Sequence, residues 1–403
     1  MYLLNLPELE IGRVMDRSKW EVDNKTFGEV FDLFMGRTPS RDNDSYWQDG
    51  RYEWLSIGDM GETKYLSKTK EKVSAEAVAN MQQVPENTVV MSFKLSIGKV
   101  GITSIPLYTN EAIMAFPPKE GYHILPTFLY YYLQAYKWQP ANRAVMGKTL
   151  NKAVISNARI SIPPIADQQQ IVAELDCLNE MIAVKQEQLK EFDKLAQSIF
   201  YDMFGDPIEN EKGWNHCLLK DVSLTITDGD HMPPPKSESG VPFVTISNVD
   251  KDTQQIDFSS TFFVPREYYD NIPESKKPQV GDVLYTVTGS YGIPILIREN
   301  KEFCFQRHIG LIRPNKDVEP VFLCMWAGCQ SVKKHADRYA TGVAQKTVSL
   351  KVLRNFPMIL PPLSLQQQFA EKISAIEAQK ELVKQSIAET QALLDYTMDK
   401  YFG

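Results

Sequence analysis

The chain has 403 residues, which is more than a single hydrophobic core usually holds, so about two domains are expected. Hydrophobic residues make up 43% of the sequence and charged residues 24%, which excludes a disordered or collagen-like chain. The formal net charge is −7, and no run approaches the roughly 18 apolar residues of a membrane-spanning helix. The start of the chain also lacks the basic and apolar regions of a signal peptide, and we expect a cytoplasmic protein.

The negative charge is concentrated in two segments. Residues 161–205 contain 3 Lys and Arg against 8 Asp and Glu, and residues 360–403 contain 4 against 6. Residues 25–160 contain 16 against 13, and residues 217–359 contain 17 against 16. An overall pI therefore says little about any one face of the molecule. On charge alone, a chance imbalance between segments is an equally good explanation.

Residues 1–160 are predicted to form a mixed domain of short strands and helices. Thr88–Phe93 is rich in β-forming residues and predicts a strand, whereas Phe128–Gln134 predicts a buried helix. Gly147-Lys148-Thr149 is similar to the end of a phosphate-binding loop, but such a loop has another glycine five residues earlier, where Asn142 stands. Without that glycine the backbone amides cannot wrap a phosphate, so a nucleotide site is not favoured.

Residues 161–205 are predicted to form a long helix. Pro163-Pro164 fixes the entry of the chain, and Asp167 is a candidate N-cap. Apolar positions then follow alternating steps of four and three residues, which is a heptad seam with one charged interruption. The seam consists of Ile171, Leu175, Leu178, Ile182, Lys185, Leu189, Phe192, Ala196, Ile199 and Met203. A helix of this length is roughly 50–60 Å long, and its narrow apolar stripe requires a partner.

Residues 206–359 are predicted to form a second mixed domain. Val241–Ile246 and Val283–Val287 predict strands, and Val321–Trp326 predicts a buried helix. Pro233-Pro234-Pro235 marks a loop. Asp228-Gly229-Asp230-His231 could be part of a metal site, but a turn is favoured because no second cluster of ligands completes it.

Residues 360–403 repeat the first long helix. Ile162–Ile171 recurs as Leu360–Phe369, 198 residues later, and the match continues without a gap to the two Phe-Gly pairs that end the segments. The second seam consists of Phe369, Ile373, Ile376, Lys380, Val383, Ile387, Thr390, Leu394, Thr397 and Tyr401. The two helices are expected to form an antiparallel coiled coil that relates two similar units by a pseudo-twofold axis. Packing of each helix on its own domain is the alternative.

The mixed domains repeat as well. Trp54–Asp59 aligns with Phe243–Asn248, and Ser96-Ile97-Gly98 aligns with Ser290-Tyr291-Gly292. The internal repeat therefore predicts two copies of one unit, each a mixed domain followed by a long helix.

Two short motifs differ between the copies. Gln345-Lys346-Thr347 matches Gly147-Lys148-Thr149 but lacks its glycine, so the shared feature is an exposed cation beside a hydroxyl. That pair suits a DNA phosphate or a base edge, with a solvated turn as the alternative. Arg37-Thr38-Pro39 has no clean counterpart in Asp230–Pro233.

Motifs for catalysis and for metal or disulfide chemistry are absent from the sequence. It contains no HExxH, no GxSxG and no aspartate-rich metal loop, and its five histidines have no ligand spacing. The five cysteines are widely spaced and form no CxxC pair, which argues against a disulfide framework or a zinc cluster. The chain is expected to recognise a partner rather than to catalyse a reaction.

The whole arrangement resembles the specificity (S, HsdS) subunit of type I restriction–modification systems. The resemblance covers about Phe27 to Gly403. Its most specific pieces are Phe27–Val30, Gly36–Pro39, Trp54–Met60, the two segments with Pro-Pro followed by Gln-Gln, Met203–Pro207 and Gly213-Trp214.

The resemblance implies an α+β fold with two tandem mixed α/β target-recognition domains, each followed by a long helix. The first recognition domain would be residues 1–160 and the second residues 206–359. Residues 161–205 and 360–403 would be the helices that act as a spacer and dock other subunits.

The resemblance also implies a non-catalytic subunit that reads a split, asymmetric target in double-stranded DNA, one recognition domain per half-site. Two methyltransferase (M) subunits would dock on the helices, and motor–nuclease (R) subunits would join the full complex. No cofactor is expected in this chain. S-adenosylmethionine, ATP and magnesium would be bound by the partner subunits, and adenine would be flipped from the stack for methylation.

Cationic and amide side chains are the candidate DNA-binding residues, because Arg and Gln can bind guanine and adenine bidentately and Lys often contacts phosphate. The candidates in the first domain are Arg37, Arg41, Lys94, Arg143 and Lys148. Those in the second are Lys236, Lys276, Lys277, Arg338, Gln345 and Lys346. Ordinary surface charge is the alternative for each.

Three other functions stay open. A protein-binding coiled-coil scaffold without DNA specificity would also need the helices, but it would not need two diverged loop-rich domains. A nucleotide-using enzyme would rest on Gly147-Lys148-Thr149 alone. A subunit of a system that only methylates DNA is a third possibility, since a nuclease would be a separate chain.

Overall fold

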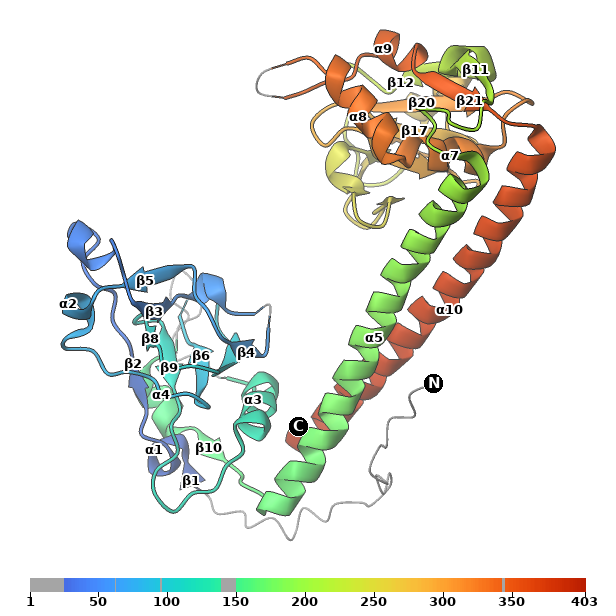
Figure 1. Ribbon diagram of the computed structural model, residues 1–403. Helices are drawn as coiled ribbons and strands as arrows, with labels where there is room; N and C mark the ends of the chain where they lie inside the picture. The colour runs from blue at the N-terminus through green and yellow to red at the C-terminus, as the bar shows by residue number, and fades with distance from the viewer. Residues whose placement is uncertain (1–24, 62, 95, 139–149, 343–344) are drawn as a thin grey trace. The chain divides into compact units, whose positions relative to one another are not determined.

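The computed structural model describes residues 25–61, 63–94, 96–138, 150–342 and 345–403 (Figure 1). The chain divides into two compact units, Met1–Val184 with Ile387–Gly403, and Lys185–Ser386. Each unit contains one mixed domain and a part of each of two long helices.

The first mixed domain is built around a five-stranded sheet in the order β2-β9-β6-β7-β4 and a three-stranded sheet in the order β5-β3-β8. A third, two-stranded sheet pairs the start of the domain with its end through β1 and β10. The strands are β1 (Lys25–Thr26), β2 (Phe34–Met35), β3 (Tyr52–Leu55), β4 (Tyr65–Leu66), β5 (Glu71–Val73), β6 (Val89–Ser92), β7 (Val100–Thr103), β8 (Tyr108–Thr109), β9 (Ile113–Ala115) and β10 (Arg159–Ile160). The helices are α1 (Phe27–Val30), α2 (Ala75–Val78), α3 (Pro126–Ala135) and α4 (Lys152–Asn157).

The second mixed domain has a four-stranded sheet in the order β12-β20-β17-β18 and a three-stranded sheet in the order β16-β13-β19. Two-stranded sheets join β11 to β21 and β14 to β15. The strands are β11 (Asn215–Leu218), β12 (Ser223–Asp228), β13 (Val241–Val244), β14 (Val249–Asp250), β15 (Gln255–Ile256), β16 (Phe262–Val264), β17 (Val283–Thr286), β18 (Pro294–Leu296), β19 (Cys304–Phe305), β20 (Ile309–Pro314) and β21 (Pro357–Leu360). The helices are α6 (Arg266–Asp270), α7 (Pro320–Gly328), α8 (Gln330–Tyr339) and α9 (Leu350–Arg354).

The strands and buried helices expected from residue type are confirmed. All residues of β6 and of β17 are buried, which explains their continuous apolar sequences. Helices α3 and α7 each begin with a proline at the first turn, where the missing N–H has no intrahelical partner to lose. Their apolar faces enter the two hydrophobic cores.

The repeat predicted within the mixed domains is confirmed by equivalent hydrogen bonds. The main-chain N–H of Ser56 donates to the Asp59 carboxylate at 2.9 Å, and that of Thr245 donates to the Asn248 amide oxygen at 2.8 Å. Both bonds close a single helical turn after the corresponding strands β3 and β13. The aligned sequence segments thus adopt the same local structure.

Two continuous helices, α5 (Ile165–Phe204) and α10 (Leu363–Phe402), each contain 40 residues and are about 60 Å long (Figure 1). Helix α5 begins directly after Pro163-Pro164, so Asp167 lies in its first turn and not at the N-cap as expected. In the first turn its charge is still favourable toward the partial positive charge of the helix start.

The two helices run antiparallel within each unit. In the first unit the hydroxyl of Tyr401, near the end of α10, donates to Glu174, near the start of α5. In the second unit the ammonium of Lys380 lies 2.7 Å from the Asp193 carboxylate. The seam positions of both helices are buried or half-buried, as the predicted coiled-coil pairing requires. Each domain also shares its hydrophobic core with both helices, the first domain with Leu175 and Leu394 and the second with Phe200 and Phe369.

Candidate nucleic-acid interface

A close backbone approach occurs at equivalent places in the two domains. A Cβ atom on Gly36 would lie 1.7 Å from the carbonyl oxygen of Thr109, and one on Gly229 would lie 1.8 Å from that of Phe305. The next residue donates its N–H to the same carbonyl, from Arg37 at 2.9 Å and from Asp230 at 2.9 Å. Arg37 and Asp230 therefore occupy equivalent backbone positions, a match that the sequence alignment missed.

The loop that follows β8 or β19 is fixed in the same way in both domains. The N–H of Asn110 donates to the carbonyl of Leu55 at 3.1 Å. That of Gln306 donates to the carbonyl of Val244 at 3.0 Å. Such paired bonds place the following residues, Glu111 and Arg307, at equivalent positions.

A third and a fourth segment join this loop. The N–H of Phe93 donates to the carbonyl of Ala112 at 2.9 Å, and the N–H of Leu150 donates to the carbonyl of Phe93 at 3.2 Å. In the second domain, the N–H of Val287 donates to the carbonyl of His308 at 2.9 Å, and the N–H of Val348 donates to the carbonyl of Val287 at 2.8 Å. Four segments that are distant in sequence thus meet in each domain. We call them the first recognition edge (36–39, 93–94, 109–112 and 150) and the second recognition edge (229–233, 287–292, 305–309 and 345–348).

Among the candidates of the first domain, Arg37 lies exposed on the first recognition edge. Lys94 is half-buried on the same edge. Arg41 is exposed but already bound, because its guanidinium pairs with Glu71 at 2.6 Å and lies 3.6 Å from the centre of the Trp47 ring. Arg143 and Lys148 lie outside the described residues.

Three candidates of the second domain lie in the segment between β12 and β17. Lys236 is exposed, with its ammonium 4.9 Å from the centre of the Phe262 ring. Lys276 and Lys277 are half-buried and point to protein acceptors, the carbonyl of Gly229 at 3.2 Å and the carboxylate of Glu274 at 2.5 Å. Lys236 is therefore the most available of the three.

The other candidates of this domain, Arg338, Gln345 and Lys346, are exposed around α8 and the second recognition edge. The carbonyl of Lys346 accepts the N–H of Gly289 at 3.1 Å, which fixes its backbone on the hairpin between β17 and β18. The hydroxyl of Thr347 donates to Thr288 at 3.2 Å. The ammonium of Lys346 is thereby presented from an ordered segment.

A polar cluster joins α8 to the hairpin between β17 and β18. The hydroxyl of Tyr291 donates to Asp337 at 2.6 Å, and the ammonium of Lys333 lies 3.3 Å from the Tyr291 ring centre. Burial lowers the pKa of Lys333, and the nearby charge of Lys346 acts in the same direction. The bond from Tyr291 holds the pKa of Asp337 below its ordinary value.

Sequence reasoning missed Glu111 and Arg307, both exposed at equivalent places on the two edges. Arg307 makes no side-chain ion pair with the residues that the structure describes. The hydroxyl of Thr38 donates to the Glu111 carboxylate and lowers its pKa against a smaller effect of burial. Extending the repeat alignment through Asn110-Glu111 and Gln306-Arg307 is the signal that could have found them.

The Asp228–His231 segment is the end of β12 followed by a bridge from Asp230 to Gln306, and not the turn favoured from the sequence, because Asp230 continues the strand pairing. His231 lies 2.9 Å from the Asp228 carboxylate, and Asp230 accepts a hydrogen bond from Tyr268 at 2.8 Å. Within the described ranges, no group of three potential metal ligands comes together. The five cysteines, all described, are free.

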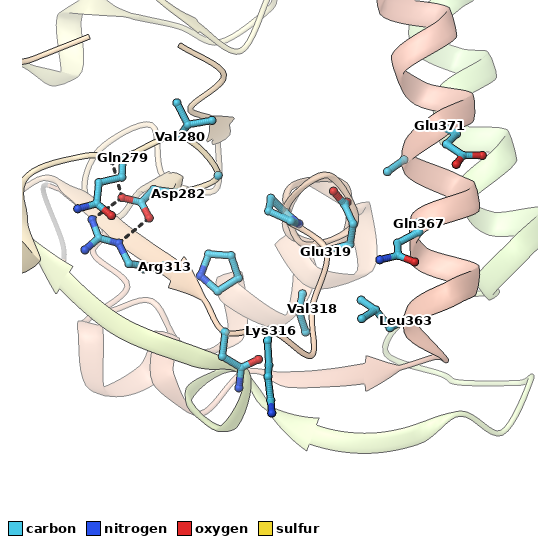
Figure 2. A pocket seen from close by; sticks show the side chains of 15 residues that line it. Gln279, Val280, Asp282, Arg313, Lys316, Val318, Glu319, Leu363, Gln367 and Glu371 are labelled. Carbon is cyan, nitrogen blue, oxygen red and sulfur yellow. Dashed lines mark hydrogen bonds and ion pairs between the residues drawn. The ribbon is translucent and has the colours of Figure 1, made fainter. Parts of the chain in front are cut away.

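A hollow of about 650 Å³ opens in the second unit where α7 and α10 begin (Figure 2). Figure 2 shows Arg313 bound to Asp282 on one side, with Glu319, the N-cap of α7, and Gln367 of α10 on the other. Burial raises the pKa of Glu319. Because none of the residues that line the hollow belongs to a recognition edge, it is not part of the candidate interface.

A family model described as the type I restriction modification DNA specificity domain matches residues 18–193 and, a second time, residues 211–392. The chain belongs to this family. Both matched segments contain a recognition edge, and both extend into a long helix. The family relationship therefore supports DNA target recognition as the role of the repeated unit.

Two similar relatives come from Methanocaldococcus jannaschii. The MjaIX specificity subunit of a type I restriction enzyme is 26% identical over 270 residues, which cover 60% of this chain and 61% of that relative. The match thus spans less than two thirds of its length. The putative MjaX specificity subunit is 23% identical over 403 residues, which cover 93% and 90% of the two chains. Specificity subunits are non-catalytic, which agrees with the expectation that the chain recognises rather than reacts.

A solved structure supports the fold. A chain from a study of complex assembly and conformational transition of the type I R-M system covers 94% of this chain and 96% of its own, with a TM-score of 0.60 and 18% identity. The predicted fold class, two mixed domains each followed by a long helix, is confirmed. None of the described helices is long and apolar enough to cross a membrane.

Proposed function

We propose that the chain reads a split, asymmetric target in double-stranded DNA, one mixed domain for each half, within a type I restriction–modification complex. Two methyltransferase subunits dock on the long helices, and motor–nuclease subunits join through them. S-adenosylmethionine, ATP and magnesium belong to those partners.

The observation that carries the proposal is the pair of recognition edges. Their backbones share equivalent hydrogen bonds, whereas their exposed side chains differ, as Arg37 and Asp230 illustrate. Two readers with one scaffold and different side chains suit two short, unlike sequences at a fixed separation. The candidate cations Arg37, Lys236, Arg338 and Lys346 are exposed and able to meet phosphate or base edges.

The helices supply surfaces for docking that are repeated as well. Val184 and Leu382, which are 198 residues apart, are 62% and 57% exposed. Leu195 and Leu393, again 198 residues apart, are exposed too. Large exposed apolar side chains at repeated places suit two copies of one partner protein. The net negative charge of both helices disfavours phosphate and suits protein contacts.

The test is to map adenine methylation in the host's DNA with this gene intact and with the gene deleted. The expected result is a split motif with an undefined middle that disappears on deletion. Exchanging residues 25–160 for those of a diverged relative should then change one half of the motif only.

The same test distinguishes DNA recognition from the alternative of a protein-binding coiled-coil scaffold. If deletion removes no motif, DNA binding by the purified complex with the methyltransferase subunits decides between a silent methyltransferase and a scaffold. Salt-dependent affinity supports DNA recognition, and its absence supports the scaffold.

A further inference from the structure

The two recognition edges present opposite charges at one shared backbone position. Glu111 occupies this position in the first domain and Arg307 occupies it in the second. Each follows the residue whose N–H is bound to the strand β3 or β13. Each also precedes the residue whose carbonyl accepts an N–H from Phe93 or Val287. The position is therefore held from both sides.

The backbone of Arg307 has an additional support. Its own N–H donates to the carbonyl of Asp230 at 3.0 Å, so the loop is fixed to the end of β12 as well. A side chain that reads a base needs a backbone that is fixed in this way, because discrimination between bases depends on placing the hydrogen-bond donors within a few tenths of an ångström. A phosphate contact tolerates much more movement.

The chemistry of the two side chains is complementary. A guanidinium presents a fork of donors that matches the O6 and N7 acceptors of guanine in the major groove. A carboxylate only accepts, and it matches bases that offer an exocyclic amino group there, which are cytosine and adenine. The hydrogen bond from Thr38 to Glu111 leaves further acceptor sites of that carboxylate open.

We propose that Arg307 and Glu111 are specificity-determining residues, Arg307 as a hydrogen-bond donor to a base and Glu111 as an acceptor. Arg307 contacts a guanine in one half-site, and Glu111 contacts the amino group of a cytosine or an adenine in the other. The inference rests on the proposed function. An acidic group beside DNA weakens non-specific binding, because phosphates repel it. Selection of a base with an amino group would explain why Glu111 nevertheless stands on the edge.

The experiment uses the chain assembled with its methyltransferase subunits, on duplexes in which each specified base of the wild-type motif is changed in turn. Arg307→Ala should lower discrimination at one guanine position of one half by about tenfold or more, with the other half unchanged. Glu111→Ala should relax one position in the opposite half and increase affinity for non-cognate duplex. Arg307→Lys keeps the charge but not the fork, and should lose discrimination while retaining affinity.

Matched controls are Arg298→Ala and Glu86→Ala, exposed residues of the same two domains outside the edges. Both should preserve the wild-type motif. If the wild type has a split motif but Arg307→Ala weakens binding uniformly, Arg307 contacts phosphate and the inference is wrong. It is equally wrong if Glu111→Ala leaves every position as selective as before. A wild type without any split motif overturns the proposed function itself.

Discussion

Gln168 and Gln366 occupy the same buried position at the start of the two long helices, and each binds three backbone groups. The amide oxygen of Gln168 accepts the N–H of Leu125 at 2.9 Å, and its nitrogen donates to Pro163 at 2.9 Å and His123 at 3.1 Å. The repeated Gln-Gln-Gln motif thus fastens the start of a long helix to the start of α3.

Gln366 makes the corresponding bonds in the second unit. Its oxygen accepts the N–H of Glu319 at 2.9 Å, and its nitrogen donates to Pro361 at 2.8 Å and Asp317 at 3.4 Å. Both glutamine side chains are fully buried. A buried amide with all these partners is stable in an apolar environment. Its loss leaves several buried polar groups without a hydrogen-bond partner, either from the protein or from water.

The first prediction follows from this burial. Gln168→Leu should destabilise the first unit by about 3 kcal/mol, because the Leu125 N–H and two carbonyls lose their partner. Gln169→Ala is the matched control, since Gln169 is exposed. Hydrogen exchange during denaturant titration reads the two units separately. Equal stability of the two variants would contradict the structural role of Gln168.

Local sequence patterns were sufficient to predict much of the fold. The 198-residue repeat, the heptad seams and the buried strands depend on residues close in sequence or on direct self-similarity, and these are the features that the structure confirms. The N-cap at Asp167 was wrong, because Pro163-Pro164 allows the helix to begin at Ile165, three residues earlier than a cap at Asp167 would.

The candidate site was harder to predict, because it forms where four distant segments pair. Arg41 binds Glu71, 30 residues away, and Lys276 binds the Gly229 carbonyl, 47 residues away. The sequence around either cation does not indicate these partners. Arg307 stands among ordinary polar residues in sequence. Its position beside Asp230 appears only in the folded chain, where the Arg307 N–H donates to the Asp230 carbonyl.

The second prediction concerns the repeated lysines. Lys346→Ala should weaken DNA binding by the assembled complex across all sequences and reduce the slope of log affinity against log salt by about one, as loss of one phosphate contact does. Lys148→Ala should do the same. Lys316→Ala, an exposed lysine outside the edges, is the control. Unchanged affinity in both lysine variants, with folding intact, would defeat the proposed contact.

The third prediction is a loss of stability in acid that depends on His335. Burial lowers the pKa of this imidazole, and Arg338 adds to the effect. Well above the pKa of about 6.5 that a histidine has in the unfolded chain, the group is neutral in both the folded and the unfolded chain. As the pH falls further, the unfolded chain takes up the proton first, so stability is lost until the folded pKa is passed.

Thermal unfolding at pH 7.5 and pH 5.5 measures this effect. His335→Gln should show a smaller decrease in Tm between the two pH values than the wild type, whereas His123→Gln, at an exposed histidine, should match the wild type. An equal decrease in all three proteins would show that the acid sensitivity arises elsewhere.

The fourth prediction tests docking on the helices. Val184→Glu and Leu382→Glu place a charge on repeated exposed apolar positions, so each should reduce the number of bound methyltransferase subunits from two to one. The double variant should bind none. Native mass spectrometry of the purified complex counts the subunits. Gln186→Glu, at an exposed polar position on the same helix, is the control. Full occupancy in the double variant would place the docking surface elsewhere.

The last prediction concerns the glycines of the two edges. Gly229→Ala would force a methyl group to within 1.8 Å of the Phe305 carbonyl oxygen, so β12 and the loop with Arg307 must separate. We expect the second domain to lose at least about 2 kcal/mol of stability and the complex to lose recognition of one half-site. Gly36→Ala should remove recognition of the other half.

Gly58→Ala separates these effects from a general cost of replacing glycine. Its Cβ would meet the Ser56 hydroxyl at 3.5 Å, an ordinary contact, and its backbone does not require glycine. This variant should keep both halves of the motif. Because neither edge glycine lies on α5 or α10, Gly36→Ala and Gly229→Ala should still assemble with methyltransferase subunits. Loss of the same half-site in both edge variants would contradict the assignment of one half to each domain.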